Sequence, residues 1–199
     1  VNTAASLFES AARTGHAEAN YNLGLLFLNG SGKPKNVHRA ALHIGYAAEQ
    51  GIAAAQYDYA GLVEQGVGVE QNAYEQARWL SKAAEQGLAA AQYEYAVMLL
   101  RGRGLKVDVP KAIVLLKDAA RKGVAGAQNR LAHVYDQGVR VSPDPLQMAK
   151  WRFLAAEAGF DDAALDSKVA ALPAETRLKA QQLAARFRDT ALVAPLSLQ

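Results

Sequence analysis

The sequence contains no cysteine, and only 8% of its 199 residues are Phe, Trp or Tyr. The absence of cysteine excludes disulfide bonds and cysteine-based metal or nucleophile chemistry, and it is compatible with any redox compartment. No apolar run approaches the ~18 residues that a membrane-spanning helix requires. The chain also lacks a charged and then apolar amino-terminal segment, which would be typical of a signal peptide. We therefore expect no insertion into a membrane. Because the chain opens with Val1 in place of methionine, we also expect that an upstream part has been removed.

Basic residues are unevenly distributed but form no stripe. Residues 1–99 contain 6 Lys and Arg against 9 Asp and Glu, whereas residues 100–199 contain 16 against 10. A basic half can indicate a nucleic-acid partner. Here the basic residues alternate with aspartates, and no aromatic residues are interleaved with them, so a nucleic-acid partner is not expected.

Glycine, by contrast, recurs at a constant interval of 36 residues. The sequence Ala-Ala-Glu-Gln-Gly stands at 47–51 and again at 83–87, and related versions end at the other members of the series. The series consists of Gly15, Gly51, Gly87, Gly123 and Gly159. A fixed period of this length is typical of a solenoid, in which each unit buries its apolar face against its neighbours. Because the period contains no insertion, we expect one quasi-linear domain.

Each period predicts a first helix that begins soon after its glycine. Apolar or small residues recur four, eight, nine and twelve residues after it, which is the spacing of one stripe of an α-helix. The alanine at the first of these positions recurs after Gly159 as Ala163. A second glycine, fifteen residues after the first, ends each helix with left-handed backbone geometry. The predicted first helices cover 17–29, 53–65, 89–101 and 125–137.

A second helix is predicted to fill the rest of each period. Asn36, Asn72, Asp108 and Asp144 stand at its start, and all four are preferred N-cap residues. The Gly-x-Gly pairs that precede these caps lack the upstream strand, the third glycine and the lysine of a phosphate-binding loop. We therefore interpret them as turns.

One period reads Gly-x-Ala-x-Ala-Gln-Tyr, then Gly-x-Gly-Val, then Ala-Arg-Trp-Leu-x-Lys-Ala-Ala-Glu-Gln-Gly at 77–87. This pattern resembles the Sel1-like repeat family, a relative of the tetratricopeptide repeats. The resemblance implies an all-α fold, a right-handed superhelical α-solenoid of helix-turn-helix repeats whose concave face is lined by the first helices. It further implies a non-enzymatic scaffold or adaptor for other proteins.

The resemblance divides the chain into four parts. Residues 1–15 are the second helix of a partial repeat, 16–159 are four repeats, 160–190 are a degenerate repeat helix and a C-terminal capping helix, and 191–199 are a tail. Further repeats are expected before Val1. A membrane-surface amphipathic helix is the alternative for the end of the chain. The last segments resemble repeat proteins of Gram-negative bacteria that are often exported, which favours the periplasm over the cytoplasm.

Positions that change from repeat to repeat are the candidates for specific binding. On each first helix they lie seven, ten and fourteen residues after the glycine, on one face opposite the packing stripe. We predict that they line a concave surface for an extended or helical peptide, and a solvated face without ligand is the alternative. The candidate residues are Asn22, Leu25, Asn29, Asp58, Gln65, Glu94, Val97, Arg101, Arg130, His133 and Gln137. Tyr21, Tyr57 and Tyr93 flank this face, where we favour packing over ligand contact.

No pattern in the sequence indicates catalysis. His16, His38, His43 and His133 occupy different repeat positions and share no metal-ligand spacing. No nucleophile elbow or metalloprotease helix is present. We expect no enzymatic activity, metal or cofactor, and a protein or peptide partner in envelope or regulatory signalling. A glycan-binding envelope scaffold and a structural spacer within a larger protein are the alternatives.

Overall fold

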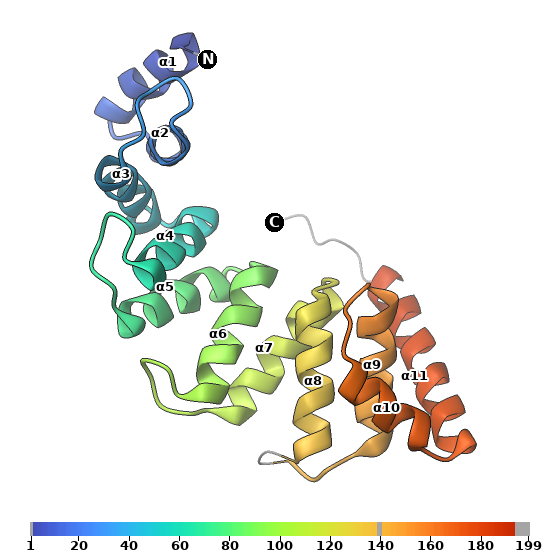
Figure 1. Cartoon of the computed structure of the whole chain (residues 1–199). Coiled ribbons are helices and arrows are strands. Elements are labelled where there is room, and N and C mark those ends of the chain that lie inside the picture. The colour runs from blue at the N-terminus through green and yellow to red at the C-terminus, as the bar shows by residue number, and fades with distance from the viewer. Residues whose placement is uncertain (1, 139–140, 194–199) are drawn as a thin grey trace. The chain divides into compact units, whose positions relative to one another are not determined.

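The structure is a computed structural model that describes residues 2–138 and 141–193, and throughout these ranges the chain forms only helices, turns and loops (Figure 1). The first helices of the four repeats cover the residues that the sequence predicted, so the all-α repeat fold is confirmed. The helices are α1 (Asn2–Arg13), α2 (Ala17–Asn29), α3 (Val37–Glu49), α4 (Ala53–Gln65), α5 (Ala73–Glu85), α6 (Ala89–Arg101), α7 (Val109–Arg121), α8 (Ala125–Gln137), α9 (Pro145–Glu157), α10 (Ala163–Ala171) and α11 (Ala174–Val193).

The helices belong to two compact units. An N-terminal unit with α1 to α6 ends at Val107, and a C-terminal unit with α7 to α11 begins at Asp108. The expectation of one quasi-linear domain stays a prediction. Because each repeat of an array contacts mainly the neighbouring repeats, the interactions that stabilise each unit are local.

Each second helix ends in the backbone turn that its glycine permits. At the end of α3 the amide of Ile52 donates to the carbonyl of Ala47 over 3.2 Å, and the amide of Gly51 donates to Ala48 over 3.1 Å. This pair of bonds is a Schellman motif, which needs a left-handed residue, and Gly51 has a φ of 94°. A Cβ at Gly51 would meet no atom within 4 Å. The backbone conformation alone therefore requires glycine here.

The loops after α4 and α6 each contain a glycine that is needed for a different reason. Gly104 follows α6, and a Cβ on it would overlap the backbone of Ala73 at the start of α5. Gly68 lies in the same way against Val37 of α3. The loop after a first helix thus packs directly on the start of the preceding second helix. The matching residue of the last repeat, Arg140, lies outside the described residues.

The predicted N-caps of the second helices are confirmed. Asn36, Asn72, Asp108 and Asp144 each accept a hydrogen bond from a backbone amide in the first turn of the helix that follows. These bonds satisfy amides that have no partner within the helix. The cap residues therefore set where the second helices begin.

A buried amide side chain holds each first helix to the second helix before it. Gln56, Gln92 and Gln128 donate to the backbone carbonyls of Ala48, Ala84 and Ala120 over 3.2, 3.3 and 3.2 Å. Asn20 makes the corresponding bond to Ala12 over 3.3 Å. Each of these carbonyls also accepts the backbone amide of the turn glycine, as Ala48 does from Gly51. The side-chain amide therefore binds the second lone pair of the same carbonyl oxygen. The sequence analysis missed this role, although the recurrence of Gln was visible.

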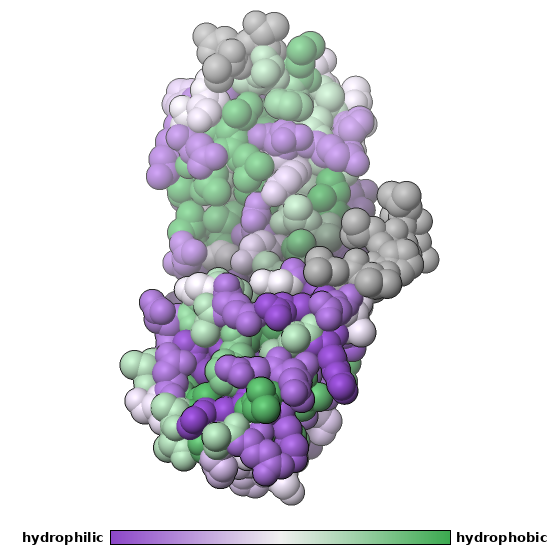
Figure 2. All heavy atoms as spheres, turned by 90° about the vertical axis from the view of Figure 1, so that its right-hand side faces the viewer, coloured by the Kyte–Doolittle hydropathy of each residue, from purple (hydrophilic) through white to green (hydrophobic). Residues whose placement is uncertain are grey.

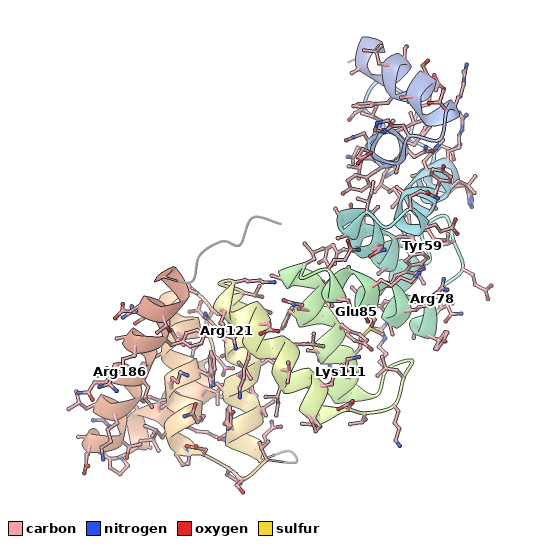
Figure 3. The ribbon with its side chains drawn as sticks, turned by 180° about the vertical axis from the view of Figure 1, so that it is seen from behind. Tyr59, Arg78, Glu85, Lys111, Arg121 and Arg186 are labelled. Atoms are coloured by element: carbon pink, nitrogen blue, oxygen red, sulfur yellow. The ribbon has the colours of Figure 1, made fainter. Side chains whose placement is uncertain are left out.

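Aromatic side chains fill the space between first and second helices where alanine cannot. In the N-terminal unit the rings of Tyr59 and Trp79 meet edge to face, with 5.5 Å between their centres. The guanidinium of Arg78 covers the same indole at 4.9 Å, and Figure 3 shows Tyr59 and Arg78 in one region of α4 and α5. This packing buries the indole of Trp79, which is 3% exposed.

The C-terminal end departs from the repeat. Asp162 accepts a hydrogen bond from the Leu165 amide, so α10 begins at Ala163 and has only nine residues. A regular first helix begins two residues earlier in its period. This late start explains why Ala163, unlike the buried alanines at its repeat position, is exposed.

The long helix α11 covers α9, and the ring of Phe187 meets Trp151 with 4.9 Å between ring centres. The face of the C-terminal unit seen in Figure 2 is mostly hydrophilic, which suits the end of a repeat array. α11 continues to Val193, past its expected end at residue 190. Residues 194–199 of the expected tail lie outside the described residues. Among the described helices, none is long and apolar enough to cross a bilayer.

Candidate functional site

The eleven predicted binding residues fall on both units, eight on the N-terminal unit and three on the C-terminal unit. We call the eight the first-helix surface. Its outermost residues, Asn29, Gln65 and Arg101, are exposed, and the other five are partly buried. The first-helix surface consists of Asn22, Leu25 and Asn29 of α2, Asp58 and Gln65 of α4, and Glu94, Val97 and Arg101 of α6.

Two tyrosine–carboxylate pairs connect the successive first helices of the N-terminal unit. The Tyr21 hydroxyl of α2 donates to Asp58 Oδ2 of α4 over 2.7 Å. One repeat later, the Tyr57 hydroxyl of α4 donates to Glu94 Oε1 of α6 over 2.6 Å. The favoured packing role of these two tyrosines is thus supported by their contacts. Asp58 and Glu94 also serve within the chain, since each accepts a hydrogen bond from a tyrosine of the preceding repeat.

Partial burial raises the pKa values of both tyrosines and of Glu94. Burial and the hydrogen bond to Asp58 raise the pKa of Tyr21 to about 12. Burial also raises the pKa of Tyr57, to which its hydrogen bond with Glu94 adds. The pKa of Glu94 is raised by burial and by repulsion from Glu64, against the lowering effect of the hydrogen bond from Tyr57. The Glu94 carboxylate is therefore incompletely solvated, which favours a positively charged neighbour.

Positive charge is scarce on these helices. α2 and α4 contain no Lys or Arg, and α6 contains one, Arg101 at its last residue. The same three helices carry the carboxylates of Glu18, Asp58, Glu64 and Glu94. Of these, Glu64 of α4 pairs over 2.9 Å with Arg103 from the loop after α6. The first-helix surface itself thus has two carboxylates, on α4 and α6, against the one cation at the end of α6, and exposed amide side chains stand at the ends of α2 and α4.

In the C-terminal unit the corresponding positions have a different character. Arg130 stands where α4 and α6 have Asp58 and Glu94, and Gln137 is exposed. His133 contacts Asp162 through Nε2 over 2.8 Å, and Asn129 donates to the same Asp162 oxygen over 2.9 Å. The imidazole nitrogen that the sequence placed on the binding face is therefore engaged within the chain.

Asp162 is the most strongly perturbed carboxyl of this unit. Burial acts to raise its pKa. Hydrogen bonds from Asn129, the Leu165 backbone and His133 outweigh burial and lower the pKa of Asp162 to about 2. A carboxylate held ionised by three donors is a structural acceptor and not a general base at neutral pH.

A buried arginine, which the sequence analysis missed, completes this region. Arg152 of α9 is 2% exposed and forms a bidentate pair with Asp166 of α10, with distances of 2.6 and 3.0 Å. It also donates to the Phe160 carbonyl over 2.7 Å and to Asn129 over 3.3 Å. A signal was present in the sequence, because the same repeat position is Ile44, Leu80 or Leu116 in the other repeats. This network attaches α10 to α8 and α9.

Metal ligands are not gathered among the residues that the structure describes. They include no group of three or more His, Asp or Glu side chains placed to hold a metal ion. The other histidines have local partners: His16 contacts Glu18, His38 contacts the Gly68 carbonyl and His43 contacts Asn20.

Comparison with known proteins agrees with this architecture. The sequence profile of the Sel1 repeat family matches four consecutive stretches, residues 17–52, 53–88, 89–124 and 125–160. No curated protein matches the chain.

Three solved structures are similar to the chain. A Sel1 repeat protein from Oxalobacter formigenes is 30% identical, with a TM-score of 0.71 over 98% of this chain and 80% of the other. A protective antigen of uropathogenic Escherichia coli with an SLR fold is 25% identical, with a TM-score of 0.77 over 98% of this chain. The chain spans 44% of the length of that antigen. A putative Sel1 repeat protein from Klebsiella pneumoniae is 21% identical, covers 94% of this chain and 99% of the other with a TM-score of 0.51, and supports the fold alone.

Proposed function

The chain belongs to the Sel1 repeat family, and from this premise we propose that it is a non-catalytic scaffold whose first-helix surface binds a segment of a partner protein. Sel1 repeats are generally protein-interaction scaffolds, and proteins built from them are typically non-catalytic. The observation that carries the proposal is the recurrence of a partly buried carboxylate at one position of successive first helices, as Asp58 on α4 and Glu94 on α6. Exposed amides recur in the same way on α2 and α4, as Asn29 and Gln65. Such a surface presents equivalent groups at regular steps, which suits a linear peptide.

A peptide is better supported than a glycan. Glycan binding would be favoured by exposed aromatic rings gathered on the first helices. Among the described residues, the exposed aromatic side chains Tyr46, Tyr74 and Phe160 lie on α3, on α5 and after α9. Tyr21 and Tyr57 of the first helices are partly buried, and their hydroxyls are engaged by carboxylates.

Site-specific photo-crosslinking tests this proposal. A benzophenone amino acid is placed at Val97 on the first-helix surface, and the control is placed at Leu42 of α3, which is 73% exposed. We expect a specific protein adduct in native extract from the Val97 position and none from Leu42. Adducts from Leu42 alone, or identical background from both, would contradict the proposal.

The compartment and pathway belong to the same proposal. We propose a periplasmic scaffold in envelope or regulatory signalling, supported by the resemblance of the terminal segments to exported repeat proteins. Fractionation of native cells by osmotic shock tests this, with release together with a periplasmic marker as the expected result. Retention with a cytoplasmic marker would replace the periplasm by the cytoplasm.

A further inference from the structure

We infer that the first-helix surface selects a basic protein segment, in which Lys or Arg side chains are spaced to reach Asp58 and Glu94 on successive repeats. This inference rests on the proposed function and names the chemistry of its partner. It is carried by the charge of the surface, by the geometry of the two carboxylates and by the contrast with the rest of the molecule.

The charge of the surface is the first step. α2 and α4 contain no Lys or Arg, and Glu64 of α4 pairs with Arg103 from the loop after α6. Among the described residues, Asp58 and Glu94 have no ion-pair partner. The second helices of the same unit are mixed in charge. In α5, for example, Glu75 pairs with Arg78 over 2.9 Å, and Lys82 and Glu85 follow on the same helix. The acidic character is thus confined to the first helices.

The geometry of the carboxylates is the second step. Asp58 and Glu94 each accept a tyrosine hydroxyl on one oxygen, at 2.7 and 2.6 Å. The second oxygen of each has no hydrogen-bond partner among the described residues. A carboxylate has lone pairs for several donors, so an ammonium or guanidinium group can bind the second oxygen while the tyrosine holds the first. The two side chains are therefore oriented before a ligand arrives.

The repeat spacing is the third step. Asp58 and Glu94 lie on first helices of successive repeats, which the bond from Tyr57 to Glu94 joins. A separation of about 10 Å between such helices corresponds to about three residues of an extended chain at roughly 3.3 Å per residue. A segment with Lys or Arg at every third residue matches this spacing. The C-terminal unit has Arg130 at the corresponding position and repels such a segment. The N-terminal unit alone is expected to select it.

Fluorescence anisotropy with defined peptides tests the inference on the whole chain. The probe is a labelled peptide of repeated Lys-Ala-Ser triplets, and the controls are the Glu-Ala-Ser peptide and a peptide of the same composition with its lysines clustered at one end. We expect the spaced basic peptide to bind more tightly than both controls. Two partly exposed charge pairs together correspond to about a tenfold difference in Kd.

Matched charge variants make the test specific to the surface. Asp58→Asn with Glu94→Gln should weaken binding of the spaced basic peptide about tenfold. Glu49→Gln with Glu85→Gln removes the same charge from the exposed ends of α3 and α5, where Figure 3 marks Glu85, and should change Kd less than about twofold. Circular dichroism confirms that both variants remain helical. Equal losses in the two variants, or binding no tighter than that of the Glu-Ala-Ser peptide, would overturn the inference.

The failure of this inference is distinguishable from failure of the proposed function. Mass spectrometry of the Val97 adduct identifies the segment that lies on the surface. A basic segment supports the inference. An acidic or apolar segment overturns the selection by charge and leaves the scaffold proposal intact, whereas the absence of a specific adduct overturns the scaffold proposal itself.

Discussion

The two units have different kinds of side-chain interaction at the same repeat positions. In the N-terminal unit, tyrosines of one first helix donate to carboxylates of the next, at partly exposed sites. In the C-terminal unit the tyrosine position is Asn129, and the acceptor of the next repeat, Asp166, pairs with the buried Arg152. Inside an array a link between helices can remain accessible and also serve a ligand. At the end of the array a buried charge fixes a short helix that has no full repeat to stack on.

The largest effect is expected from removing the carboxylate that pairs with Arg152. Asp166→Ala leaves the guanidinium charge buried with only the Phe160 carbonyl and Asn129, which should cost about 3 kcal/mol of unfolding free energy. Glu157→Ala is the matched control, because its pair with Arg188 is exposed on both sides and should contribute less than about 1 kcal/mol.

The two tryptophans of the sequence report the units separately, since Trp79 lies in the N-terminal unit and Trp151 in the C-terminal unit. Urea unfolding is followed by the fluorescence of Trp151 in a Trp79→Phe background. We expect the Asp166→Ala loss in this signal. Equal losses for Asp166→Ala and Glu157→Ala would show that Arg152 does not anchor the end of the array.

The second prediction concerns a feature that the units share. Gly51→Ala and Gly123→Ala place a Cβ in open space and strain only the left-handed backbone, at φ values of 94° and 84°. Each should cost about 1 kcal/mol. The measurement is urea unfolding read by the tryptophan of the respective unit. A cost several times larger in one unit would mean that the two units also differ in their turns.

The third prediction isolates a tyrosine–carboxylate pair. Tyr57→Phe removes one hydrogen bond to a charged acceptor at a partly buried site, so the N-terminal unit should lose about 1 kcal/mol. Tyr93→Phe is the matched control, because the Tyr93 hydroxyl has no hydrogen-bond partner among the described residues, and it should change stability little. A double-mutant cycle with Glu94→Ala then measures the coupling within the pair. Additive effects of Tyr57→Phe and Glu94→Ala would show that this bond does not stabilise the N-terminal unit.

The helices and caps could be predicted because each depends on residues close in sequence. Asn72 caps α5, which begins at the next residue, and Gly51 forms the turn that ends α3. A 36-residue period therefore fixes both positions. The partnership of Tyr57 with Glu94 joins side chains 37 residues apart and depends on how the helices stack, which the period does not specify. Arg152 broke the aliphatic pattern of its repeat position, but its acceptors come from three separate segments. Composition alone could not bring them together.

The smallest expected effect is on how stability depends on pH, where Asp162 and Glu94 should act in opposite directions. The pKa of Asp162 is lowered to about 2 in the folded chain, below the ordinary value of about 4 in the unfolded chain. Its contribution to stability is therefore complete above about pH 4 and is lost as the pH falls toward about 2. Asp162→Asn should flatten this acid-side loss in the Trp151 signal.

Glu94 should act in the opposite direction, because burial raises its pKa in the folded chain. The folded state then binds the proton more tightly, and stability declines as the pH rises through the folded pKa. Glu94→Gln removes this decline and keeps an acceptor for Tyr57, so the Trp79 signal should become less dependent on pH above about 4. Melting temperatures of the two variants and the parent across this range measure both slopes. Slopes of the same sign would show that Glu94 is as well solvated as an ordinary surface carboxylate, and the surface would then lose the incomplete solvation that favours a cation.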